Sequence, residues 1–160
     1  DLGIQNSRGF RALKVWLALK QIGRNGYRRM IADDIDLAQY LYMIISHYPE
    51  FEAFTHDLSI VTFRYVPEDL KGESGSESVR EYLNNLNQEI LFKLETGGEA
   101  FLSNAVIDDI YLMRACIVNF RTTLADIEMI PDIILPVAKQ VDASMRQVLL
   151  KNVKSGVDQQ

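Results

Sequence analysis

The first apolar segment of the chain has the spacing of a helix that is hydrophobic on all sides. This helix is expected over residues 7–23, with Gly23 as its C-terminal stop. Its apolar side chains cover most of the circumference and are Phe10, Leu13, Val15, Trp16, Leu17, Leu19 and Ile22. A helix of this kind needs cover on several sides. We therefore expect Phe10, Trp16 and Leu17 to contact something outside the domain predicted below, or to form an exposed patch.

A second helix and one or two strands follow. The helix is expected over residues 27–47, because apolar side chains recur there at helical spacing and Pro49 ends the pattern. The next two apolar runs, FEAFT and LSIVTFRYV, are rich in β-branched and aromatic residues and predict strands. The polar stretch after them, VPEDLKGESGSES, is typical of a loop.

The third predicted helix begins with a capping box. Ser78 is followed three residues later by Glu81, the pairing that satisfies free backbone N–H groups at a helix start. The glycines at positions 97 and 98 stop the helix. Its apolar stripe consists of Val79, Leu83, Leu86, Ile90 and Leu94.

The last third of the chain predicts a hairpin and a final helix. AFLSNAVI, a turn at residues 108–109 and the apolar run IYLMRACIVNF form the hairpin. Thr123 with Asp126 caps the last helix, and Pro131 and Pro136 are expected to kink or break it. The order of elements predicts an α+β fold, a small, mostly antiparallel sheet with helices packed on it.

Arg114 is the unusual residue of the apolar run. Strand alternation places it on one face with Ile110, Leu112, Cys116 and Val118. That face should be dry, and Cys116 is expected in the core. A guanidinium stays charged, so burying it requires an anionic partner. The partner is either an acid of the chain, for which Asp108, Asp109 and Glu99 are candidates, or a ligand.

Composition narrows the class of protein. With 160 residues, 48% of them hydrophobic, the chain can form one domain with a proper core, and no run is apolar enough to span a membrane. A net charge of −5 argues against nucleic-acid binding. The single cysteine favours a reducing, cytoplasmic setting, and the two histidines give no metal-binding spacing. The opening DLGIQNSRGF has no initiator methionine or signal sequence, so we expect a piece of a longer protein.

Two segments together resemble a known enzyme family. SRGFRALKVWLALKQIGRNGY, residues 7–27, is similar to the segment after the cofactor lysine in the group II pyridoxal-phosphate-dependent amino acid decarboxylases. YLMRACIVNFRTTLADI, residues 111–127, is similar to the last strand and helix of the same enzymes, which include aromatic amino acid, tyrosine and glutamate decarboxylases. The two segments lie in the family's order, so the resemblance covers nearly the whole chain.

The resemblance implies a fold type I enzyme that works as a homodimer. Residues 1–50 would be connecting helices from a missing large domain, and residues 51–160 the C-terminal small α+β domain. The Schiff-base lysine and the other residues that bind pyridoxal phosphate would lie upstream of Asp1. Lys14 and Lys20 would then not be the cofactor lysine, and this segment alone would be inactive, with no catalytic, cofactor-binding or metal-binding residue of its own.

The resemblance also gives Arg114 a role. In the glutamate decarboxylases of this family, an arginine at this place in the last strand holds the α-carboxylate of the substrate, so the resemblance makes Arg114 the candidate substrate-binding residue. Arg8 matches the family's Ser-Arg pair and is expected in an ion pair at the domain junction. Asn119 and Arg121 are expected to hold the turn into the last helix.

The function expected from these points is the C-terminal part of a pyridoxal-phosphate-dependent L-amino acid decarboxylase with an aromatic substrate. One alternative is a non-catalytic regulatory or dimerisation module of the same fold class. Another is a related fold type I enzyme such as an aminotransferase, which only upstream residues would distinguish. The expected partners are a small amino acid and a second subunit, with neither nucleic acid nor membrane.

Overall fold

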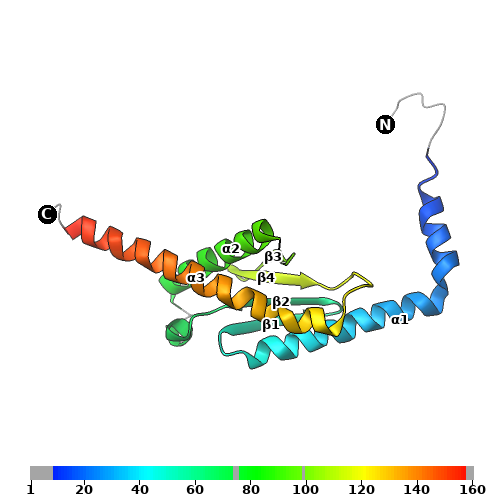
Figure 1. Cartoon of the computed structure of the whole chain (residues 1–160), viewed down its shortest axis with the longest axis horizontal. Coiled ribbons are helices and arrows are strands. Elements are labelled where there is room, and N and C mark those ends of the chain that lie inside the picture. The colour runs from blue at the N-terminus through cyan, green and yellow to red at the C-terminus, as the bar shows by residue number, and fades with distance from the viewer. Residues whose placement is uncertain (1–8, 74–75, 99, 158–160) are drawn as a thin grey trace.

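The chain forms a four-stranded sheet with three long helices (Figure 1). The computed structural model describes residues 9–73, 76–98 and 100–157. The elements are α1 (Ala12–His47), β1 (Phe51–Asp57), β2 (Ile60–Tyr65), the 3₁₀ helix η1 (Glu68–Glu73), α2 (Glu77–Gly97), β3 (Ser103–Ile107), β4 (Ile110–Cys116) and α3 (Leu124–Val157). The predicted α+β class is confirmed. Within the described ranges, no helix is both long enough and apolar enough to cross a bilayer.

The sheet is antiparallel throughout, with the strand order β1-β2-β4-β3. The predicted turn at residues 108–109 joins β3 to β4, and both of its residues have positive φ angles, 49° and 63°. Two-residue hairpin turns with this backbone fit the right-handed twist of the strands. The turn pairs Ile107 with Ile110, and the register that follows places Ser103 opposite Arg114. On the other side of β4, Thr62 of β2 is opposite Arg114.

One face of the sheet is covered by the helices. Helix α1 packs against β1 and β2, α2 packs mainly against β4, and α3 contacts both other helices. The strand residues of this core are Phe51, Val61, Phe63, Tyr65, Met113 and Ala115. Leu112 is also buried but points to the opposite face and lies apart from this core. We call that opposite face the outer face; it carries Glu52, Thr62, Arg64, Ser103, Leu112 and Arg114.

Helix α1 bends at the position where the sequence predicted its end. Gly23 has a φ of 69° and a ψ of 170°, outside the helical region, and the chain resumes a helix immediately after it. The part before Gly23 turns away from the sheet (Figure 1). Trp16 and Leu17 on this part, and Phe10 just before the helix, are exposed, as predicted. The part after Gly23 contributes Ala38, Leu41 and Ile45 to the core. The expected division of the chain at residue 50 stays a prediction.

Two helix predictions are wrong in detail. Helix α2 begins at Glu77 and is capped by Ser76, whose Oγ accepts from the Val79 N–H at 3.4 Å, so Ser78 is not the cap. Helix α3 runs through Pro131 and Pro136 without ending, so the predicted break does not occur, whereas the predicted kink stays a prediction. A proline inside a helix costs about 3 kcal/mol. Packing on both sides of these prolines offsets that cost, through the buried residues Ile127, Ile134, Ala138 and Val141.

A polar network ties η1, α2 and α3 together at one end of the sheet. The Arg146 guanidinium bonds Asp69 through Nη1 at 2.6 Å and Nη2 at 3.0 Å, and Asp142 through Nε at 3.0 Å. The Tyr82 hydroxyl donates to Asp142 at 2.6 Å. The bonds to Arg146 lower the pKa of Asp69, whereas burial and the bond to Asp142 raise the pKa of Tyr82. The network joins three elements that are distant in sequence.

Asn87 of α2 completes the hydrogen bonding of β2. The residue is fully buried. Its Oδ1 accepts from the Tyr65 N–H at 2.7 Å, and its Nδ2 donates to the Tyr65 and Leu83 carbonyls at 2.9 and 2.8 Å. Tyr65 is the last residue of β2, where the ladder would otherwise leave these groups unpaired.

Replacement of Asn87 by alanine should destabilise the chain by about 2–4 kcal/mol, because it leaves buried backbone groups without partners. Urea unfolding of the variant would give this cost. Asn85→Ala is the matched control, since Asn85 is exposed on the same helix and should change stability by less than about 0.5 kcal/mol. Equal midpoints for the two variants would contradict the role given to Asn87.

The outer face contains an unequal ion pair. Arg64 is only 3% exposed, whereas its partner Glu52 is 44% exposed. Both Nε and Nη2 of Arg64 lie 2.6 Å from Glu52 Oε2, and its buried Nη1 has no hydrogen-bond partner among the residues that the structure describes. Loss of the acid would leave a buried charge without compensation, whereas loss of the arginine would leave a carboxylate that water can reach.

Glu52→Ala should therefore destabilise the chain more than Arg64→Met, with the acid's removal costing about 3–5 kcal/mol. The free energies of unfolding of both variants are measured by urea unfolding. Glu50→Ala is the control, because Glu50 pairs with the exposed Lys139 at 3.3 Å and such pairs contribute about 0–1 kcal/mol. An Arg64→Met cost equal to or larger than that of Glu52→Ala would overturn this account of the pair.

Candidate functional site

Arg114 lies in the middle of β4 and is half-buried on the outer face. Its Nε donates a hydrogen bond to Ser103 Oγ at 2.9 Å. The Ser103 hydroxyl in turn donates to the main-chain oxygen of Arg114 at 3.3 Å. On the other side, the Thr62 hydroxyl pairs with that of Thr55 at 2.6 Å. The Arg114 side chain is therefore anchored toward β3 through Nε.

We expected the face of β4 that carries Arg114 to be buried from solvent, and this expectation is wrong at one end of the strand. Leu112 is buried, but Cys116 and Val118 are exposed. The strand ends at Cys116 instead of continuing to Phe120, and the helices cover the opposite face of the sheet. Cys116 is therefore not a core residue, contrary to the prediction from its apolar neighbours.

None of the acids in the described ranges forms an ion pair with Arg114. Asp108 and Asp109 occupy the hairpin turn, at the far end of the ladder from the Ser103–Arg114 pair. Glu99, the third candidate, lies outside the described residues. Among described residues, Nη1 and Nη2 of Arg114 have no hydrogen-bond partner, so both remain available to an anionic ligand.

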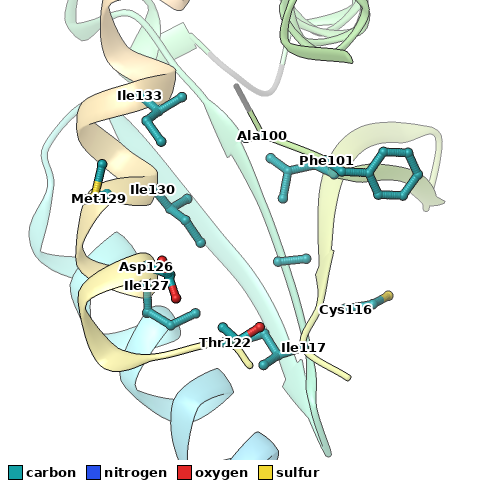
Figure 2. A pocket seen from close by; sticks show the side chains of 12 residues that line it. Ala100, Phe101, Cys116, Ile117, Thr122, Asp126, Ile127, Met129, Ile130 and Ile133 are labelled. Carbon is teal, nitrogen blue, oxygen red and sulfur yellow. The ribbon is translucent and has the colours of Figure 1, made fainter. Parts of the chain in front are cut away.

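A pocket of about 370 Å³, lined mostly by apolar residues, lies between the end of β4 and the start of α3 (Figure 2). Ile130 and Ile133 point from α3 toward the strands, whereas Phe101 and Cys116 point away from the helix (Figure 2). Among the described residues that line the pocket, Asp126 is the only charged one, and Arg114 is not one of them. The pocket is therefore separate from the arginine.

The carboxylate of Asp126 is committed to the helix cap. It accepts from the Thr123 N–H and hydroxyl, both at 2.7 Å, which lowers the pKa of Asp126 and confirms the predicted cap. Asn119 also has its expected role, since its Oδ1 accepts from the Arg121 N–H at 3.1 Å. The Arg121 guanidinium lies 5.5 Å from the centre of the Phe120 ring. These residues shape the turn into α3.

Every lysine whose side chain the structure describes is exposed. Lys14 and Lys20 lie on the part of α1 that leaves the sheet, and Lys20 Nζ lies 5.7 Å from the centre of the Trp16 ring. Arg8 lies outside the described residues. No cluster of metal-ligating side chains occurs within the described ranges.

Sequence reasoning missed Ser103 and the pair of Arg64 with Glu52. Ser103 could have been found, because counting outward from the two-residue turn at 108–109 pairs it with Arg114. Arg64 could have been assigned to the outer face by strand alternation, although its burial depends on neighbouring strands. The sequence gives no local signal for that burial.

The chain is similar in sequence to decarboxylases over most of its length. Residues 1–66 match the family model described as the pyridoxal-dependent decarboxylase conserved domain. An aromatic-L-amino-acid decarboxylase of Bacillus atrophaeus is 32% identical over 145 residues, which is 90% of this chain and 29% of that protein. Tyrosine decarboxylase 4 of Petroselinum crispum is 31% identical over 128 residues, which is 79% of this chain and 24% of that protein. The chain thus spans less than a third of the length of these curated relatives.

The fold agrees with a solved structure. The crystal structure of mouse CSAD in its apo form superposes with a TM-score of 0.75 at 22% identity, and covers 85% of this chain and 29% of that one. This likeness shows the fold, and the sequence matches agree with the resemblance at residues 7–27 and 111–127. The chain is therefore similar to the pyridoxal-dependent decarboxylases in sequence, and it shares the fold of part of a solved structure.

Proposed function

We propose that the chain is part of a pyridoxal-phosphate-dependent amino acid decarboxylase in which Arg114 binds the substrate α-carboxylate. The observation that carries the proposal is the state of the Arg114 guanidinium. It is half-buried and anchored through Nε, and its two terminal nitrogens have no partner among the described residues. A guanidinium in this state fits an anionic ligand better than an internal ion pair.

The chemistry of decarboxylation supports this role. A guanidinium holds a carboxylate through two parallel N–H···O bonds, which fix its orientation as well as its position. The bond from Cα to the carboxylate must be held in one orientation for that bond to break, and such positioning contributes strongly to rate. The cofactor supplies the electron sink, and we propose that the residues holding it lie in other parts of the complete protein.

The names of the two relatives favour an aromatic substrate, because one is an aromatic-L-amino-acid decarboxylase and the other a tyrosine decarboxylase. They also favour a decarboxylase over a regulatory module or an aminotransferase. We further propose that the complete protein is a cytoplasmic homodimer. The exposed apolar side chains Phe10, Trp16 and Leu17 would then be covered by the rest of the subunit or by its partner.

Arg114→Ala in the complete protein should lower kcat/KM by roughly thirtyfold to several thousandfold, because truncating one partner of a desolvated charged contact costs about 2–5 kcal/mol. Arg114→Lys should recover little, since an ammonium lacks the planar two-point grip. Steady-state kinetics, cofactor absorbance and thermal unfolding would be measured on the same preparations. Arg80→Ala, on α2 at the helical side of the sheet, is the control. Unchanged kcat/KM per cofactor-loaded subunit in Arg114→Ala would refute the carboxylate role.

The 160-residue chain by itself should not bind pyridoxal phosphate at a defined site, because its described lysines are all exposed. Borohydride reduction after incubation with the cofactor, followed by peptide mapping, should give only scattered substoichiometric lysine adducts. Labelling of one lysine at one equivalent per chain would show that the cofactor residue lies within these residues.

A further inference from the structure

Ser103 makes two hydrogen bonds to the same residue, and that residue is Arg114. The Ser103 hydroxyl accepts from Arg114 Nε at 2.9 Å and donates to the Arg114 main-chain oxygen at 3.3 Å. The two residues are directly opposite each other on β3 and β4, so the register of the hairpin sets this contact. A hydroxyl has one donor hydrogen and two acceptor lone pairs, so both bonds can form at once.

This contact decides which edge of the guanidinium is left for a ligand. A carboxylate can approach a guanidinium along the edge formed by Nε and one Nη, or along the edge formed by Nη1 and Nη2. The bond to Ser103 occupies Nε. The edge formed by Nη1 and Nη2 is then the only edge of the guanidinium on which both nitrogens lack a partner among the described residues.

We propose that Ser103 is a positioning residue for Arg114, and that the substrate α-carboxylate binds end-on to Nη1 and Nη2. This inference rests on the proposed function, in which Arg114 binds the substrate α-carboxylate. The Ser103 hydroxyl fixes the arginine before the substrate arrives. An arginine side chain otherwise has many rotamers, and restricting it in advance reduces the entropy lost on binding. Ser103 itself touches neither substrate nor cofactor in this account.

Neighbouring residues do not replace this contact. Thr62 is opposite Arg114 on the other side, but its Oγ1 is engaged by the hydroxyl of Thr55 at 2.6 Å and accepts from the Thr55 N–H at 3.1 Å. Leu112, the nearest buried neighbour on the same face of β4, has no polar side-chain atom. The anchoring of Nε therefore depends on the hydroxyl at position 103.

The test compares Ser103→Val with Ser103→Thr in the complete enzyme. The two side chains have the same shape and both suit an edge strand, but only threonine has the hydroxyl. The substrate is whichever of tyrosine, tryptophan, phenylalanine and 3,4-dihydroxyphenylalanine is turned over fastest. Ser103→Val should lower kcat/KM roughly five- to fiftyfold, mainly by raising KM, and Ser103→Thr should stay within about threefold of wild type. Asn104→Ala, at the next position of β3 and facing the other way, is the control and should also stay within about threefold.

Two further measurements separate positioning from a merely structural role. The amine product lacks the carboxylate, so its inhibition constant should be unchanged in Ser103→Val. In an Arg114→Lys background, which has no Nε, Ser103→Val should cause no further loss of kcat/KM. An equal loss in both backgrounds, or a loss explained by lower cofactor loading or thermal stability, would overturn the inference.

The same set of variants distinguishes this inference from the proposed function. If Arg114→Ala has wild-type kinetics, Arg114 does not bind the carboxylate and both proposals fail. If Arg114→Ala loses activity while Ser103→Val matches Ser103→Thr, the carboxylate role stands and the positioning role of Ser103 is refuted.

Discussion

The burial of one sheet face under three helices is the constraint on which the rest of the structure depends. Side chains of an antiparallel strand alternate between faces, so packing Phe63 and Met113 against the helices forces Arg64 and Arg114 to the outer face. A shift of the register by one residue would exchange the two sets, placing arginines in an apolar core at a high cost. The same packing that stabilises the fold therefore selects the residues that can meet a ligand.

Much of this fold could be predicted from the sequence because its signals are local. The turn at residues 108–109, the Thr123 cap and the stop at Gly23 each follow from the conformational preferences of a few residues. The errors arose where distant packing overrides local preference. Pro131 and Pro136 should weaken a helix, yet α3 continues because its buried stripe packs against α1 and α2.

The candidate site was only partly predictable, for the same reason. Arg114 was identified by its charge within an apolar run, but the length of β4 and the exposure of Cys116 depend on where the helices end over the sheet. The contact with Ser103 requires the hairpin register, which the turn fixes. The burial of Arg64 beside Glu52 involves two strands and could not be read from either one. Residues that act through neighbours in space are thus the least visible in a sequence.

The central claim is that the outer face presents Arg114 to a substrate carboxylate. It is tested most directly by a crystal structure of the complete protein with a bound aromatic amino acid analogue that retains its carboxylate. The account predicts both carboxylate oxygens about 2.7–2.9 Å from Nη1 and Nη2 of Arg114, the usual length of charge-assisted bonds, with Nε still bonded to Ser103. A carboxylate held elsewhere, with Arg114 paired to an acid of the protein, would contradict it.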